Sequence, residues 1–192
     1  MTGFLVVLAV GLVLLALAAL RDRQTRLAAE RALGAPVSRV EAAPAATPDE
    51  GQRAALDRFR QQHQIVDARL ADPGMATWAD PPTAELADAD VLVCSQAPGS
   101  LRELLASLER CRPRPLLLVC PPVEPTLLGL VVASPEHRLV VAEADDEALT
   151  VVSAVTGATL VDRADLQSGW AVRCHGRLAR AVVDADGSWL EK

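Results

Sequence analysis

The chain begins with an unbroken run of apolar residues. Residues 3–20, "GFLVVLAVGLVLLALAAL", contain no charged or polar side chain. An α-helix rises about 1.5 Å per residue, so a helix over this run is about as long as the hydrocarbon core of a bilayer is thick, roughly 30 Å. We therefore expect residues 1–20 to form a transmembrane anchor, with residues 3–20 in contact with the membrane.

Positive charge lies only on the C-terminal side of this run, at Arg21, Arg23 and Arg26. Cleavable signal peptides carry positive charge before the apolar segment, and basic residues mark the cytoplasmic side of a span. A signal peptide with a weak cleavage site at residues 16–18 and a buried core helix are the alternatives. The charge pattern favours an uncleaved single-pass anchor in the cytoplasmic (inner) membrane, with the N-terminus outside and the soluble domain in the cytoplasm.

Three segments of different composition follow the expected anchor. Residues 21–34 are typical of a juxtamembrane helix, and residues 35–47 form an Ala/Pro-rich stretch that indicates a linker. Thr47 as a cap, Pro48 in the first turn and Glu50 predict a helix to about Gln62. Residues 48–84 are thus a helix and a connecting segment, and residues 70–90 show no clear period.

From Val91 the apolar pattern becomes regular. Short apolar runs predict strands at 91–94, 115–119, 137–143 and 158–161, and amphipathic runs predict helices at 101–111, 125–133 and 146–156. Ser100 and Glu103 form a capping-box pattern, and Gly157 fits a helix end. Three consecutive strand–helix–strand units indicate an α/β domain with a parallel sheet covered by helices. The remaining residues predict two or three short antiparallel strands.

Composition and motifs exclude several functions. The net charge of −6 does not favour nucleic acid as a partner. The four cysteines are irregularly spaced without a CxxC pair, which is typical of small buried side chains. No phosphate-binding loop, GxGxxG or GxSxG motif occurs. Cys174 and His175 are adjacent candidates for metal ligands, but neighbouring side chains on a strand point to opposite faces, which argues against a shared site.

We therefore predict no cofactor, no metal ligand and no catalytic residue, and expect that the protein is not an enzyme. An enzyme with an unrecognised site remains an alternative. A deep polar pocket at the C-terminal ends of the strands at 91–94 and 115–119 would support that alternative.

The order of patterns across residues 85–190 resembles the apical domain of the GroEL-type (group I, 60 kDa) chaperonin family. The matching stretches are "LRELL" from Leu101, "PLLL" from Pro115, "VE" at Val123, "LVVA" from Leu130 and "TGA" from Thr156. The family's equatorial ATPase domain has no counterpart here. The aromatic residues that line the edge of the family's groove also have no counterpart in this sequence. Pro121 and Pro122 stand where the family has acidic residues.

The resemblance implies a layered β/β/α apical-like (swivelling) domain over residues 85–192. In the family, two helices of this domain form a groove that binds non-native polypeptide through exposed Leu and Val side chains. The matched positions, which the resemblance implies as polypeptide-binding residues, are Leu105, Leu108, Leu128, Val131 and Val132. Apolar residues at helical spacing are also typical of core packing, and this alternative stays open.

Two functions follow as expectations. The first is a membrane-anchored, ATP-independent, chaperone-like module that binds unfolded polypeptide. The alternative is a non-catalytic membrane scaffold that keeps the apical fold and docks a specific protein partner without binding clients.

Overall fold

A computed structural model of the chain describes residues 45–134 and 138–192. The expected anchor, the juxtamembrane helix and most of the linker lie in residues 1–44, outside the described residues. Within the two described ranges, no helix has both the length and the hydropathy needed to cross a bilayer.

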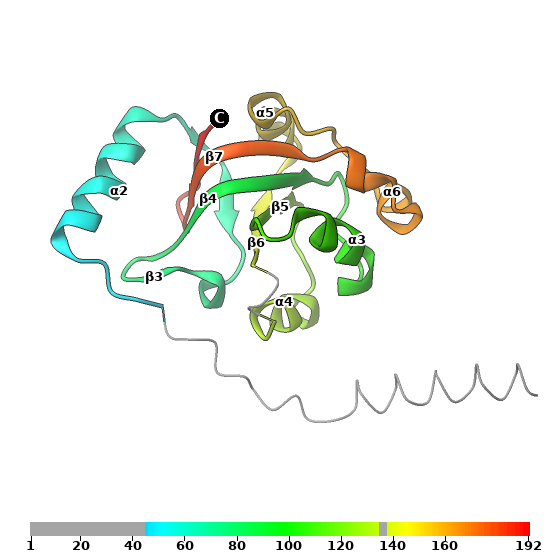
Figure 1. Cartoon of the computed structure of the whole chain (residues 1–192), viewed down its shortest axis with the longest axis horizontal. Helices are drawn as coiled ribbons and strands as arrows, with labels where there is room; N and C mark the ends of the chain where they lie inside the picture. The colour runs from blue at the N-terminus through cyan, green and yellow to red at the C-terminus, as the bar shows by residue number, and fades with distance from the viewer. Residues whose placement is uncertain (1–44, 135–137) are drawn as a thin grey trace, which may run out of the picture. The chain divides into compact units, whose positions relative to one another are not determined.

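An eight-stranded mixed sheet organises the domain (Figure 1). Its central strands β4, β5 and β6 are parallel, with Val91 opposite Leu117 and Leu117 opposite Val140. The α/β class predicted from the sequence is confirmed, and the predicted parallel pairing holds for these three strands, whereas the other strand pairs are antiparallel. In spatial order the strands are β1 (Ile65–Val66), β8 (Ser188–Glu191), β7 (Gly176–Val183), β4 (Pro82–Val93), β5 (Leu116–Cys120), β6 (Leu139–Ala144) and β2 (Ala68–Leu70), and β3 (Trp78–Ala79) pairs with the start of β4.

The two ends of this strand order are joined by one short segment. Only Asp67 separates β1 from β2, yet β1 pairs with β8 and β2 pairs with β6. The Leu70 amide donates to the Asp184 carbonyl at 2.8 Å, and the Ala71 amide donates to the Val141 carbonyl at 3.0 Å. The sheet therefore closes into a ring through residues 65–70.

Helices cover both faces of the sheet (Figure 1). The helices α3, α4 and α6 pack with the 3₁₀ helix η3 on one face of β4–β6, and α2 packs against β7 and β8. The helix α5 packs on the opposite face of the central strands. The bounds are α2 (Glu50–Gln62), the 3₁₀ helix η1 (Pro73–Met75), α3 (Leu101–Cys111), α4 (Pro125–Val132), α5 (Asp146–Thr156), α6 (Arg163–Ser168) and η3 (Trp170–Arg173).

The central strands separate two apolar cores. On β4, Val91 and Val93 point into the core that contains α5, whereas Leu92 points into the core beneath α3 and α4. Successive side chains of a strand point to opposite faces, so a strand buried on both sides must be apolar at every position. This burial explains why β5 reads as the unbroken run "LLLVC".

Two helix starts differ from the sequence prediction. The cap of α2 is Asp49 rather than Thr47, because the Asp49 carboxylate accepts from the Gln52 amide at 2.7 Å and the Gln52 side chain accepts from the Asp49 amide. Ser100 precedes α3 but makes no capping bond; Glu103 accepts from the Gly99 amide at 2.8 Å instead. Both helices are present, and their capping patterns were wrongly predicted.

The predicted strand at 158–161 is wrong. Val161 makes a single parallel bridge to Cys94, and the chain then enters α6. Asp162 and Asp165 form a capping box there, which starts a helix directly after this bridge. The antiparallel strands predicted near the C-terminus are confirmed as β7 and β8. The boundary drawn between residues 84 and 85 falls inside β4, and residues on both sides of it belong to the same sheet.

Candidate functional site: an apolar groove beside α4

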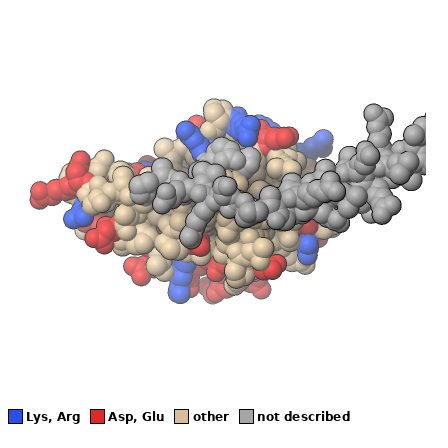
Figure 2. All heavy atoms as spheres, turned by 90° about the horizontal axis from the view of Figure 1, so that it is seen from below, with Lys and Arg blue, Asp and Glu red and all other residues tan. Residues whose placement is uncertain are grey.

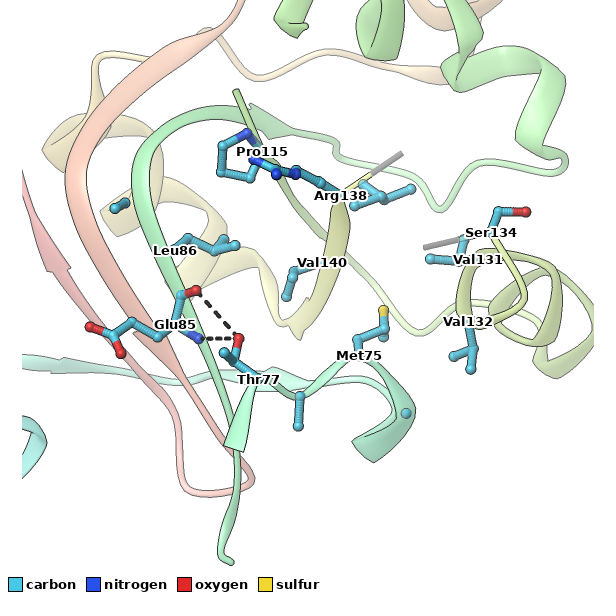
Figure 3. A pocket seen from close by; sticks show the side chains of 14 residues that line it. Met75, Thr77, Glu85, Leu86, Pro115, Val131, Val132, Ser134, Arg138 and Val140 are labelled. Atoms are coloured by element: carbon cyan, nitrogen blue, oxygen red, sulfur yellow. Dashed lines mark hydrogen bonds between the residues drawn. The ribbon is translucent and has the colours of Figure 1, made fainter. Parts of the chain in front are cut away.

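A groove of about 500 Å³ lies beside the C-terminal end of α4. One wall is the chain from Gly74 to Thr77, and a second is the middle of β4. Figure 3 shows Val140 and Met75 between β4 on one side and α4 on the other. The groove lies at the amino ends of β5 and β6, where β4 extends beyond the start of β5.

The lining of the groove mixes apolar and polar surface, with the apolar part slightly larger. Met75, Leu86, Val131, Val132 and Val140 contribute hydrocarbon surface. Such surface is stabilised by contact with other apolar groups, at about 25 cal/mol per Å² removed from water. The groove is thus chemically suited to apolar side chains.

Two polar residues that line the groove, Thr77 and Glu85, are hydrogen-bonded to one another. The Thr77 hydroxyl accepts from the Glu85 amide at 3.2 Å and donates to the Glu85 carbonyl at 3.4 Å (Figure 3). The Glu85 carboxylate accepts from Arg180 at 2.6 Å and from the indole of Trp78 at 3.0 Å. These bonds fix the wall formed by residues 74–77 against β4.

The structure places the five predicted binding residues in different environments. Leu108, Leu128 and Val131 are buried in the core beneath α3 and α4. Leu105 is 41% exposed on α3, and Val132 is half-buried. Of the five, Val131 and Val132 line the groove, and Leu105 does not. The accessible part of the predicted surface is therefore Leu105 and Val132.

Sequence reasoning missed most of the groove. Met75, Thr77 and Leu86 fall in residues 70–90, where no period was found. The one available signal was the alternation of buried Ala84 and Leu86 with half-buried Glu85, which is typical of a strand.

The cysteines were correctly predicted to be small buried side chains. All four are free and buried. Burial raises the pKa of Cys94 to about 12, and burial followed by the negative charge of Asp90 raises the pKa of Cys111 to about 12. At neutral pH these groups are thiols rather than nucleophilic thiolates.

A polar cluster that the sequence did not reveal surrounds His175. Its Nδ1 lies 3.3 Å from the Cys111 sulfur, and its Nε2 lies 3.1 Å from the Ser107 hydroxyl. Burial lowers the pKa of His175, and the nearby charges of Arg110 and Arg114 lower it further against the opposing effect of Asp90. The ring is therefore neutral at pH 7. In the described part of the chain, no group of three or more His, Cys, Asp or Glu side chains could hold a metal ion.

Acidic and basic side chains are mixed on the face shown in Figure 2. Between them lie broad areas that carry neither sign of charge. This mixture agrees with the modest net charge of −6 and gives no single-sign surface on that face.

Comparison with known proteins gives a likeness of fold. No family model and no curated protein match the chain. The chain is similar to two solved chaperonins. One is the chaperonin gp146 from bacteriophage EL of Pseudomonas aeruginosa, with 15% identity, a TM-score of 0.49, and coverage of 67% of this chain and 28% of that one. The other is the open-state monomer of a group II chaperonin from Methanococcoides burtonii, with 14% identity, a TM-score of 0.48, and coverage of 67% and 30%.

The chain thus spans less than a third of either chaperonin. Both likenesses concern the fold of part of a much longer protein. The assignment to an apical domain, rather than to any other part, stays a prediction.

Proposed function

We propose that the protein is a membrane-anchored module that binds an apolar segment of a non-native polypeptide without ATP. The groove beside α4 is the observation that carries this proposal. It combines about 500 Å³ of space with a lining in which apolar surface slightly exceeds polar surface, and its walls are tied together by the Thr77–Glu85 hydrogen bonds.

Recognition in such a groove depends on burial of side chains rather than on a particular sequence. Met75, Val132 and Val140 offer surfaces of different shape, and Met adapts to several partners because its side chain is flexible and polarisable. A client segment with one or two large apolar residues would fill the space and bury its own apolar surface there.

The sequence supports the remaining parts of the proposal. Residues 3–20 supply an apolar run of the length that an anchor needs, followed by basic residues. No nucleotide-binding motif accompanies the domain. An anchor in the cytoplasmic membrane would concentrate the groove where membrane-associated clients emerge.

A membrane scaffold with one specific partner is the second candidate. The burial of Leu108 and Leu128 favours it, because these side chains are unavailable to a client unless α3 and α4 separate. The accessible apolar surface is then small, which suits one complementary partner better than many clients.

The test uses the full chain in lipid nanodiscs and follows thermal aggregation of an unrelated protein by light scattering without ATP. We expect the parent to delay aggregation and Val132→Ser and Met75→Ser to lose the effect, because both side chains line the groove. Leu160→Ser is the matched control, since Leu160 is 44% exposed and lies outside the groove. Circular dichroism verifies that each variant is folded.

The outcomes separate the two candidates. Protection that Val132→Ser removes and Leu160→Ser retains supports client binding in the groove. If Leu105→Ser also loses protection against aggregation, the binding surface extends onto α3. A folded parent that gives no protection contradicts client binding and favours the scaffold, which crosslinking from the groove to a single membrane partner would then identify.

A further inference from the structure

A second hollow, of about 270 Å³, lies where the end of α3, η3 and the start of β7 meet. It is distinct from the groove beside α4, and the proposed function does not use it. Its lining is unusually rich in arginine for a protein of net charge −6. The charged and titratable side chains that line it are Asp90, Arg110, Arg114, Arg173, His175 and Arg177.

Two of these arginines already have acidic partners. Arg114 contacts Asp90 at 2.8 Å, and Arg177 contacts Asp88 at 2.9 Å. No ion pair within residues 45–134 and 138–192 involves Arg110 or Arg173. The hollow therefore carries two guanidinium charges that no described carboxylate balances.

The inner side of the hollow is held in place by buried polar groups. Asp90 is 6% exposed, and its bonds to Arg114 hold that guanidinium. Both ring nitrogens of His175 have partners on α3, at Ser107 and Cys111. The imidazole is thus fixed at the lining instead of turning freely into solvent.

We propose that this hollow binds a phosphate group, as the free ion or as a monoester, between Arg110 and Arg173. A phosphate dianion balances the two unpaired charges. A guanidinium presents several N–H donors in a planar fork that matches the oxygens of phosphate, and such charge-assisted bonds are stronger than neutral ones. The volume of the hollow is sufficient for the phosphate and leaves room for part of an ester group.

His175 couples this site to pH. The groups that face the imidazole are Ser107 and Cys111 on α3, Asp90 on β4, and the charges of Arg110 and Arg114. A bound dianion offsets the arginine charges that lower the pKa of His175, so binding raises that pKa. By linkage, anion affinity increases as the pH falls toward the pKa of His175.

The test is calorimetric titration of the full chain in nanodiscs with inorganic phosphate, and with sulfate as a dianion whose charge is constant between about pH 5 and pH 8. Arg110→Ala and Arg173→Ala should each weaken binding by about tenfold, the loss expected for a hydrogen bond to a charged group. Arg102→Ala is the matched control, because Arg102 is exposed on the same helix but outside the hollow.

Binding that both hollow variants weaken and Arg102→Ala preserves, with sulfate affinity rising as the pH falls, supports the site. In the same samples, ¹⁵N-edited NMR of the histidine side chains should shift at His175 and not at His63. Absence of saturable binding at millimolar phosphate, or equal affinity in parent and hollow variants, would overturn the proposal. Failure of the aggregation test leaves this proposal unaffected, since the two sites share no lining residue.

Discussion

At the scale of single residues, Glu103 connects α3 to distant parts of the chain. Its carboxylate accepts from the Gly99 amide at 2.8 Å, from Arg163 at 3.2 Å and from Gln167 at 3.1 Å. These partners belong to the loop before α3 and to α6. Although partial burial opposes the change, these hydrogen bonds and the charge of Arg163 lower the pKa of Glu103. One carboxylate thus connects two helices that are distant in the sequence.

Glu103→Gln should lower the stability of the domain at pH 7 by about 1 kcal/mol, because the charged acceptor is lost while its donors remain. The folded state holds this pKa below its usual value of 4.5, so the carboxylate stabilises the fold above that pH. The stabilisation is lost as the pH falls through the folded pKa. The difference in melting temperature between parent and variant should therefore shrink from pH 7 to pH 3.

Tryptophan fluorescence measures this melting, since Trp78, Trp170 and Trp189 all lie in the described domain. Arg69→Gln is a suitable control, because its contact with Asp67 is exposed on both sides. If the difference in melting temperature between the parent and Glu103→Gln were the same at pH 7 and pH 3, the shape of the Glu103 side chain rather than its charge would hold α6 to α3.

At the scale of elements, the sequence predicted the parts of the fold that are buried on both faces. The sequence predicted the strands β5 and β6 and the helices α3, α4 and α5, because the apolar residues of these elements recur where they pack into one or both of the two cores. Residues 82–90 of β4 were missed because their buried positions include the small residues Ala84 and Ala89, which give little apolar contrast. Residues 65–70 close the ring of strands by pairing with β8 and β6, which lie far along the chain. No local sequence pattern predicts this pairing.

The candidate site was predictable only in part, for the same reason. The sequence placed Val131 and Val132 correctly on a short apolar helix. It did not reveal which face of that helix packs against the sheet. Burial of Leu128 and Val131 is set by contacts with β5 and β6, which sequence spacing alone does not reveal. The wall at Met75 and Thr77 has no periodic pattern, because its bonds to β4 are made by an irregular segment.

Two glycines in or beside helices should respond oppositely to alanine. Gly157 ends α5 with φ of +73°, a backbone conformation that strains any residue with a Cβ, so Gly157→Ala should cost about 1 kcal/mol. Gly129 lies inside α4 with open space around an added Cβ, so Gly129→Ala should stabilise the domain by about 0.5–1 kcal/mol. Urea unfolding of the two variants beside the parent measures both changes.

Each glycine variant serves as the control for the other, because both add a single methyl group at an exposed position. Destabilisation by Gly129→Ala would mean that the environment of α4 differs from the one described. Neutrality of Gly157→Ala would mean that the end of α5 tolerates a different conformation.

At the scale of the whole domain, the ring of strands is the feature that unites the elements. The segment 65–70 holds the first and last strands of the sheet together, with Ser188 and Ala68 fully buried at the junction. Opening of this junction would expose the core beneath α5, which includes Val66, Leu178 and Leu190. The junction should therefore open only when the domain unfolds globally.

Native-state hydrogen exchange tests this cooperativity. The amides of Leu70 and Ala71 should exchange about as slowly as those of β5, because both depend on global unfolding. The amide of Gly74, which bonds only to the neighbouring Asp72 side chain, is an internal reference for fast exchange. Fast exchange at Leu70 together with slow exchange in β5 would show that residues 65–70 detach independently.

The closed ring also limits how this domain can meet another chain. A sheet with a free outer strand can capture an extended peptide through backbone hydrogen bonds, and the same strand can nucleate aggregates. In the part of the chain that the structure describes, β1 and β2 are the two outer strands of the main strand order. β1 pairs with β8, β2 pairs with β6, and only Asp67 lies between β1 and β2. A protein that binds unfolded chains would be protected by this arrangement. Its side chains could contact aggregation-prone sequences, while its own strands would not be incorporated into the fibres that such sequences form.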